Sequence, residues 1–168
     1  MGHETVILST AANPLDKLEK GALIGTSSWV TITQEMINSF GVSTLDHDPM
    51  HIDPEWAKAH GPFGGTIAFG FLTMSLLTHL MDQALDGAIH RQSAAVGYYL
   101  NYGFDRLRLV SPVYEGKRVR GVFHFKDRTP DQKGRIVQTV TAVVEIEGED
   151  RPALVADWLS VWVPPAAA

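Results

Sequence analysis

A long apolar stretch, residues 66–85, constrains the fold of this chain more than any other segment. Its apolar residues recur at spacings of three and four, and additional leucines and alanines widen the apolar surface. This period predicts one long helix. A helix that is apolar on nearly all sides must be buried on nearly all sides, so the rest of the chain has to wrap around it.

Four later segments have the composition of such a wrapping layer. They are rich in valine, tyrosine, phenylalanine and threonine, and turn-forming residues separate them. Two of them alternate apolar and polar residues, as antiparallel strands with one solvated face do. A long helix followed by antiparallel strands predicts an α+β fold in which a sheet wraps around the helix. The predicted strands are residues 94–104, 118–127, 136–146 and 153–163.

The segment before the long helix contains signals for two short helices. Thr33 is a suitable N-cap for the first helix, and Gly41 is predicted to end it in the left-handed conformation. The second helix is predicted over residues 54–60, with a proline at its first position and a glycine directly after its end. A β-branched and aromatic run at residues 27–32 precedes both helices and predicts a strand.

The bulk composition limits the function. The 168 residues fit one domain, predicted at residues 21–163, with an extension at 1–20 and a tail at 164–168. The net charge of −5 and the lack of a long basic run argue against nucleic-acid binding. The lack of cysteine excludes disulfides, a thiolate nucleophile and a zinc–thiolate site. No membrane-spanning or secretory pattern is found, so we expect a cytoplasmic protein with no membrane partner.

The candidate active site is the segment Asp46-x-Asp48-Pro49-x-His51. Its prolines remove amide donors and restrict the preceding residues, so we expect no regular helix here. An acid and an imidazole five residues apart can transfer protons at neutral pH. The glycines that follow, at the start of the long apolar stretch, can present a backbone N–H to a developing anion.

Each residue of this segment also has a structural interpretation. Asp46 and Asp48 can close Asx turns, and His51 can be a hydrogen-bonded structural histidine. A metal site is a further alternative, but Pro49 disrupts the helical geometry that His-x-x-x-His ligation requires, so we expect no metal. The four potential metal ligands are His47, Asp48, His51 and Asp53.

Two residues of the long apolar stretch are also candidates. A glycine in a helix costs about 1 kcal/mol relative to alanine, so Gly70 indicates either close approach of a ligand or close packing of helix on sheet. Thr78, two turns later, either bonds its own helix backbone or contacts a ligand.

The order of these elements around the Asp46-x-Asp48-Pro49-x-His51 motif resembles the MaoC-like hydratases, especially their nodulation-protein-N-like branch. The resemblance covers residues 20–163, including the glycine-containing helix entrance and the strand that runs to Pro112-Val113. It implies a hot-dog fold and a homodimer whose sheets join edge to edge. It also implies an (R)-specific enoyl-CoA hydratase, which converts trans-2-enoyl-CoA and water reversibly to (R)-3-hydroxyacyl-CoA. The implied partner is therefore an acyl-CoA substrate, with no cofactor beyond its coenzyme A.

The resemblance also implies roles for individual residues. Asp46 and His51 match the catalytic dyad that activates one water molecule. Gly70 matches the glycine whose N–H binds the thioester oxygen. Thr78 matches a position where some members carry an active-site serine. The sequence does not decide which member of the dyad accepts the proton of the water.

Two departures from the family pattern keep other functions open. Asp48 stands where many members have asparagine. It places a second carboxylate beside the dyad and is a candidate substrate contact. Phe69 stands where many members have histidine. The same fold would also suit an acyl-CoA thioesterase or a non-catalytic acyl-CoA-binding protein. Arg106 and Arg108 would either meet coenzyme A phosphates or be solvated strand charges.

Overall fold

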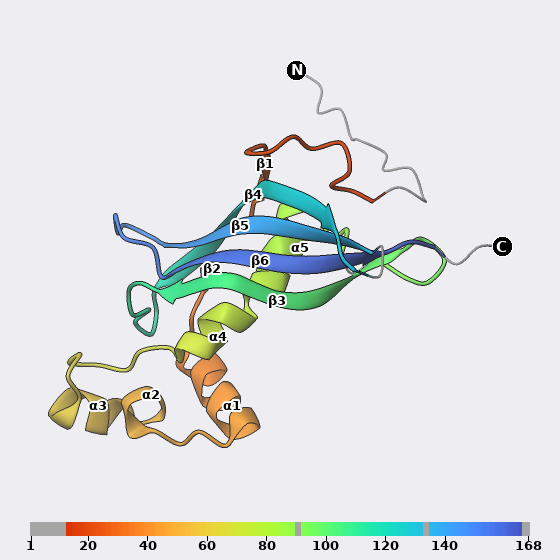
Figure 1. The fold of residues 1–168 in the computed structure, drawn as a ribbon. Coiled ribbons are helices and arrows are strands. Elements are labelled where there is room, and N and C mark those ends of the chain that lie inside the picture. Colours follow the sequence, from red (N-terminus) through yellow and green to blue (C-terminus); the bar gives the residue numbers. More distant parts are fainter. Residues whose placement is uncertain (1–12, 90–91, 133–134, 166–168) are drawn as a thin grey trace.

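The computed structural model describes residues 13–89, 92–132 and 135–165, in which an antiparallel sheet curves around a central helix (Figure 1). The sheet has the strand order β1-β4-β5-β6-β3, and β2 also pairs with β4. The strands are β1 Leu23–Thr26, β2 Val30–Thr31, β3 Tyr98–Leu109, β4 Arg118–Pro130, β5 Ile136–Ile146 and β6 Leu154–Val163. The helices are α1 Gln34–Thr44, α2 Pro49–Ile52, α3 Pro54–His60, α4 Gly70–Ser75 and α5 Leu77–Ala84.

The core lies between α5 and the face of the sheet that wraps it. Alternate residues along β4 and β5 are buried, as expected for strands with one covered face. Leu80 of α5 and Phe123 of β4 are fully buried in this core. The predicted sheet around a helix is therefore confirmed, and β5 has the predicted bounds.

The predicted long helix over residues 66–85 is wrong at its start and in its middle. Residues 66–68 bond to the chain after β3 instead, where the Ala68 amide donates to the Val113 carbonyl at 2.7 Å. The helix therefore begins at Gly70, and Leu76 separates α4 from α5. The predicted burial of this helix on all sides is also wrong for the single chain, because Phe71 of α4 is 69% exposed.

Several strand boundaries differ from the prediction as well. β3 begins at Tyr98 rather than at residue 94 and continues to Leu109. Of the predicted strand over residues 27–32, only Val30–Thr31 is a strand, β2, while β1 precedes the predicted range. The reason lies at Ser27, whose hydroxyl accepts from the Gly121 amide at 2.9 Å, so that a side chain replaces the backbone acceptor there.

The first short helix, α1, does not end at Gly41 as predicted. It continues to Thr44, and Leu45 takes the left-handed conformation with φ of 60°. Gly41 is instead buried where the chain folds back. A Cβ atom there would lie 2.8 Å from the Asp46 carbonyl oxygen and 3.1 Å from Ile52. The glycine is required by close packing, while the predicted N-cap Thr33 is confirmed, because it accepts from the Met36 amide.

The segment expected to lack regular helix contains one helical turn, α2. Pro49 occupies its first position, where no amide donor is needed, and the Asp48 side chain caps it. The next helix, α3, has its predicted bounds, and Asp53 caps it by accepting from the Trp56 amide at 2.9 Å.

The two ends of the chain are described in part. Residues 1–12 of the predicted extension and 166–168 of the predicted tail lie outside the described residues. The described residues 13–20 pack on the sheet, and Leu15 is buried in the core. Within the described ranges, no helix combines the length and apolar character that crossing a membrane requires.

Candidate active site

His51 is held in one orientation by a backbone carbonyl. It is the third residue of α2, and its Nδ1 lies 2.7 Å from the carbonyl oxygen of Ile67. Because a carbonyl oxygen can only accept, Nδ1 must carry a hydrogen. The neutral imidazole then has its free lone pair on Nε2, which is the atom able to act as a base.

The ring of His51 also packs against an aromatic wall. The imidazole lies 4.0 Å from the Phe69 ring, centroid to centroid, and Phe69 in turn contacts Phe40 at 5.4 Å. Phe69 is buried. Phe69, one of the two residues that depart from the family pattern, thus packs against the imidazole and has no titratable group of its own.

Gln34 connects the parts of the chain around His51, a role for which no sequence signal exists. Its Nε2 donates to the carbonyl oxygen of His51 at 2.8 Å, and its Oε1 accepts from the Thr66 hydroxyl at 2.6 Å. Thr66 directly precedes Ile67, the residue that binds the imidazole. One side chain of α1 therefore fixes both the helical turn and the strand-like segment beside it.

A cleft of about 230 Å³ brings His51 and Gly70 together. It lies between the start of α4 and the segment that follows β3, and its walls are mostly apolar. Its lining includes His51, Ile67, Gly70, Thr73, Leu109 and Pro112. Two of the residues singled out in the sequence thus border one cavity large enough for a small reacting group.

Gly70 is the first residue of α4, not an interior helix residue as predicted. A Cβ atom at this position would collide with the side chain of Leu109, so the packing alternative for this glycine is supported. Gly70 also lines the cleft, and within the described residues its amide donates no hydrogen bond. Close packing and access to a ligand therefore coexist at this residue.

Asp46 and Asp48 are engaged in turns. The Asp46 carboxylate accepts from the Asp48 amide at 3.2 Å, and the Asp48 carboxylate accepts from the Met50 amide at 2.9 Å. Both residues are exposed. In the described part of the chain, no hydrogen bond or ion pair joins Asp46 to His51. The structure therefore does not bring these carboxylates into the cleft.

Thr78 lies further along the central helix, away from the cleft. Eight residues separate it from Gly70, which corresponds to about 12 Å of helix. Together with Asn101 and Trp158 it borders two other cavities, of about 460 Å³ and 90 Å³, between the helices and β3. Gly70 and Thr78 thus mark two positions along one helix–strand seam.

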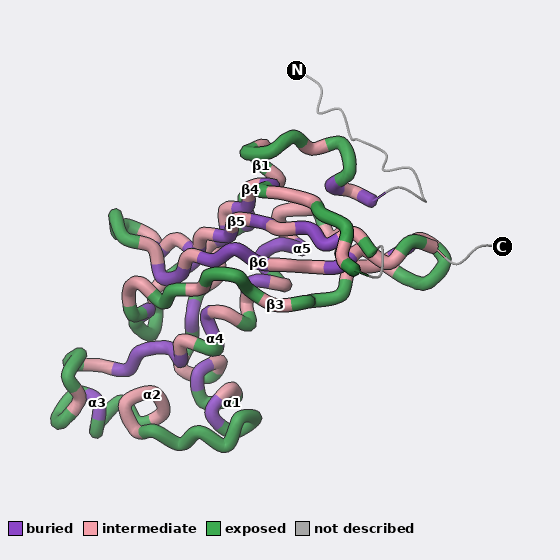
Figure 2. Tube along the Cα trace, viewed as in Figure 1, coloured by how far each residue is buried: buried purple, intermediate pink, exposed green. Residues whose placement is uncertain are grey.

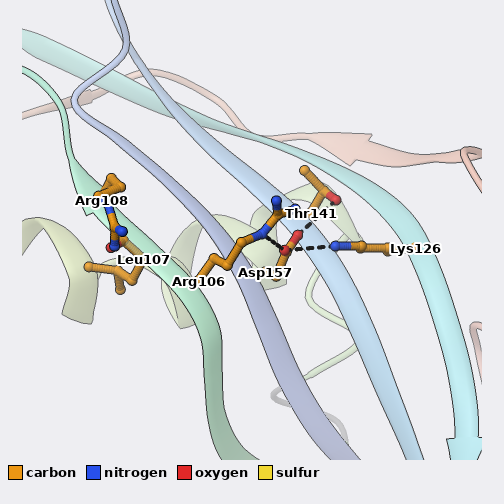
Figure 3. A network of polar contacts seen from close by, with 6 residues as sticks. All are labelled: Arg106, Leu107, Arg108, Lys126, Thr141 and Asp157. Atoms are coloured by element: carbon orange, nitrogen blue, oxygen red, sulfur yellow. Dashed lines mark hydrogen bonds and ion pairs between the residues drawn. The ribbon is translucent and has the colours of Figure 1, made fainter.

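Arg106 lies on the other face of the sheet. In the β3–β6 register Arg106 is paired with Asp157. The Asp157 side chain points away from the core, because the residues on either side of it, Ala156 and Trp158, point into the core. Figure 3 shows Arg106 and Lys126 converging on the Asp157 carboxylate, while Arg108 points elsewhere. The hydrogen bond from Arg106 lowers the pKa of Asp157, and Lys126 adds to this effect. Arg106 is therefore engaged away from the cleft.

Metal ligation finds no support in the ranges that the structure describes. They contain no group of three or more histidine, cysteine, aspartate or glutamate side chains placed to hold an ion. Of the four potential ligands, Asp48 and Asp53 cap helices and His51 bonds to the Ile67 carbonyl.

Comparison with known proteins gives consistent matches. The model of the MaoC like domain family matches residues 18–148. Nodulation protein N of Rhizobium meliloti is 43% identical over 141 residues, which is 84% of each chain. The 3-hydroxyacyl-thioester dehydratase Z of Mycobacterium tuberculosis is 42% identical over 137 residues, covering 82% of this chain and 86% of that relative.

The solved structures agree on the fold. The (R)-hydratase from A. caviae involved in PHA biosynthesis superposes with a TM-score of 0.67 and 21% identity, over 86% of this chain and 97% of that one. A monoamine oxidase regulatory protein from Archaeoglobus gives a TM-score of 0.71 at 22% identity, over 91% and 95% of the two chains. The predicted α+β hot-dog fold is confirmed.

Proposed function

Because the chain belongs to the MaoC-like dehydratase family and is therefore a hydro-lyase, we propose that it hydrates trans-2-enoyl-CoA to (R)-3-hydroxyacyl-CoA and catalyses the reverse dehydration. The observation that carries the proposal is the cleft shared by His51 and Gly70. The names of a thioester dehydratase relative and of an (R)-hydratase neighbour support the substrate class and the stereochemistry.

The reaction needs a base, an acid and a site for negative charge. The oxygen of water bonds to C3 of the enoyl group as one of its protons passes to a base. The electron pair of the double bond moves toward the thioester oxygen, and C2 then takes up a proton. His51 Nε2 is suited to accept the first proton, since Nδ1 is engaged with Ile67. The Gly70 amide is suited to bind the thioester oxygen.

Asp46 completes the proposed dyad. Its Oδ1 accepts from the Asp48 amide in this structure, and a carboxylate has a second oxygen that can accept from the water. Asp48 is proposed as a substrate contact next to it. All steps move protons and electron pairs within the substrate and water, so we propose that no cofactor is used besides the coenzyme A of the substrate.

The acyl chain is proposed to lie along the seam between the central helices and β3. The cleft at Gly70 and Thr73 is followed along the helix by the cavity beside Met74 and Leu77, and then by the one beside Thr78. An acyl group with its thioester at Gly70 would place its tail toward Thr78, which is proposed as a contact for that tail.

A homodimer formed through β3 is proposed as the working unit. Within the described residues β3 pairs only with β6, so its other edge is open, and Figure 2 shows much of this strand exposed. Tyr102 is 58% exposed on this strand, and the exposed Phe71 is nearby in the fold on α4. A long edge strand with exposed apolar side chains favours pairing with another chain. Light scattering should therefore give twice the chain mass.

The test of the activity is the loss of enoyl-thioester absorbance when the protein is added to crotonyl-CoA. Chiral analysis should find the (R)-3-hydroxy product. A thiol-reactive dye, added to the same reaction, distinguishes the alternatives. Release of free thiol would indicate a thioesterase, and binding without any turnover of several enoyl-CoA lengths would indicate a non-catalytic binder. Either result would overturn the proposal.

A further inference from the structure

The inner cavity of the helix–strand seam has a defined end. It has a volume of about 90 Å³ and shares Thr78, Asn101 and Trp158 with the larger cavity nearer the cleft. Beyond these shared residues it is lined by Met81 of α5, by Leu85 directly after that helix, and by Tyr99 near the start of β3. The two cavities are therefore adjacent, and they follow one another along the helix in the direction away from Gly70.

A residue from the start of the chain forms part of the wall of the inner cavity. Leu15 lines the inner cavity and is only 4% exposed. It belongs to a turn in which the Asp16 amide donates to the Asn13 carbonyl at 3.0 Å, and its own amide donates to the Asn13 side chain. The side chain is therefore presented to the cavity by a locally ordered piece of backbone.

The turn that carries Leu15 is bound to the sheet from two sides. Arg128 of β4 donates to the carbonyl oxygens of Leu15 at 2.6 Å and Leu18 at 2.9 Å, and also to that of Asp16. The Tyr99 hydroxyl, on β3, donates to the Asn13 side chain. Burial raises the pKa of Tyr99, so this hydroxyl keeps its proton and remains a donor across the physiological pH range.

This turn precedes the part of the chain that the family model covers. The match to the MaoC like domain begins at residue 18, whereas Asn13 and Leu15 lie before it. The cavity walls on α5, β3 and β5 lie inside the match, whereas Trp158 and Ser160 of β6 follow it and Leu15 precedes it.

We propose that Leu15 acts as a stopper that limits the length of the acyl chain accepted by the site. The inference rests on the proposed function, because it assumes that acyl thioesters occupy the seam. A tail that reaches the inner cavity meets the Leu15 side chain, and longer tails can enter only if the Asn13–Leu18 turn moves. Arg128 and Tyr99 act as positioning residues, since they hold that turn in place.

The test measures kcat/KM for crotonyl-CoA, octenoyl-CoA and dodecenoyl-CoA with the wild type and with Leu15→Ala. Leu18→Ala is the matched control, because Leu18 is in the same turn and packs on the core but does not line the cavity. A change of one or a few methylenes in an apolar pocket changes discrimination about 10-fold or more. We expect Leu15→Ala to raise the dodecenoyl-to-crotonyl ratio by at least about 10-fold, with the ratio unchanged in Leu18→Ala.

The outcomes separate this inference from the proposed function. If the wild type hydrates none of the three thioesters, the proposed function fails. If the wild type is active and the folded Leu15→Ala variant keeps its length profile, only the stopper is overturned. Should Leu15→Ala fail to fold, Arg128→Gln replaces it, because loss of the bonds to the turn carbonyls should shift the same ratio in the same direction. An unshifted ratio in that variant also overturns the stopper.

Discussion

The helices α1–α3 and the sheet with α5 are stabilised in different ways. The three helices lie beyond one end of the sheet, and Figure 2 shows α1 and α3 largely exposed, whereas β5 and β6 have only buried and intermediate residues. The apolar core reaches both regions, since Ile37 of α1 belongs to it, but side-chain caps and the Gln34 bridge add polar bonds that hold the helices together. Because His51 lies among the helices, substitutions there should alter activity more than stability. Substitutions in the sheet should do the opposite.

The largest expected effect tests the helical side of this comparison. His51→Gln should lower kcat/KM for crotonyl-CoA by about 10²–10⁴-fold, the usual contribution of a positioned acid–base group. Its melting temperature should stay close to that of the wild type, since His51 is only partly buried. Asp46→Asn is measured beside it. A folded His51→Gln variant with full activity would remove the imidazole from the mechanism.

Gly70 lies where the two regions meet, and its substitution separates packing from ligand access. Gly70→Ala should push the Leu109 side chain aside and misplace the substrate, which can cost up to about 10²-fold in rate. The double variant Gly70→Ala with Leu109→Ala removes the collision. If the double variant recovers full activity, the glycine serves packing alone. If activity stays low while the melting temperature recovers, the glycine is needed for ligand approach.

On the sheet side, Asp157→Asn should reduce stability and leave activity unchanged. The substitution removes the carboxylate that Arg106 and Lys126 bind, and because both cations are largely exposed we expect a modest loss in the free energy of unfolding. The pKa of Asp157 is lowered below its ordinary value of 3.8, so its contribution is present above that pH and disappears as the pH falls below it. Urea unfolding of both proteins at neutral and strongly acidic pH measures this difference, which should shrink in acid. A difference that grows in acid contradicts the assignment.

The smallest expected effect concerns Gln34. Gln34→Ala removes the bonds to the His51 carbonyl and the Thr66 hydroxyl, each worth about 1 kcal/mol, so we expect about a 10-fold loss of kcat. Gln34→Glu restores only the acceptor for Thr66 and should rescue the rate in part. Asn38→Ala is the matched control, because Asn38 also bonds Gln34 but contacts neither of the other two residues. Equal losses in all the variants would argue against a positioning role.

The sequence predicts those parts of the fold that depend on neighbouring residues. Thr33 as a cap, the bounds of α3 and the bounds of β5 are examples, because each depends on signals within a few positions. The start of α4 was missed, since residues 66–68 bond to the chain near Val113, far along the sequence. Gly41 was misinterpreted for a similar reason. Its neighbours in space are the carbonyl of Asp46 and the side chain of Ile52.

The candidate site was also predictable only in part. The sequence motif predicted His51 and the apolar stretch after it predicted Gly70, and the fold brings both residues to one cleft. The roles of Gln34 and Leu15 could not be read from the sequence, because each depends on partners that only folding brings near. The predicted roles of Asp46, Asp48 and Thr78 stay predictions, to be tested by activity.

The bond from His51 to the Ile67 carbonyl has a consequence for the direction of the reaction. Nδ1 carries a hydrogen in both the neutral and the charged imidazole, so this anchor would be the same before and after Nε2 gains a proton in the proposed reaction. No ring flip is needed between turnovers. Water addition and water elimination can therefore follow one path in opposite senses, and the relative amounts of the two thioesters in the cell would decide which product accumulates.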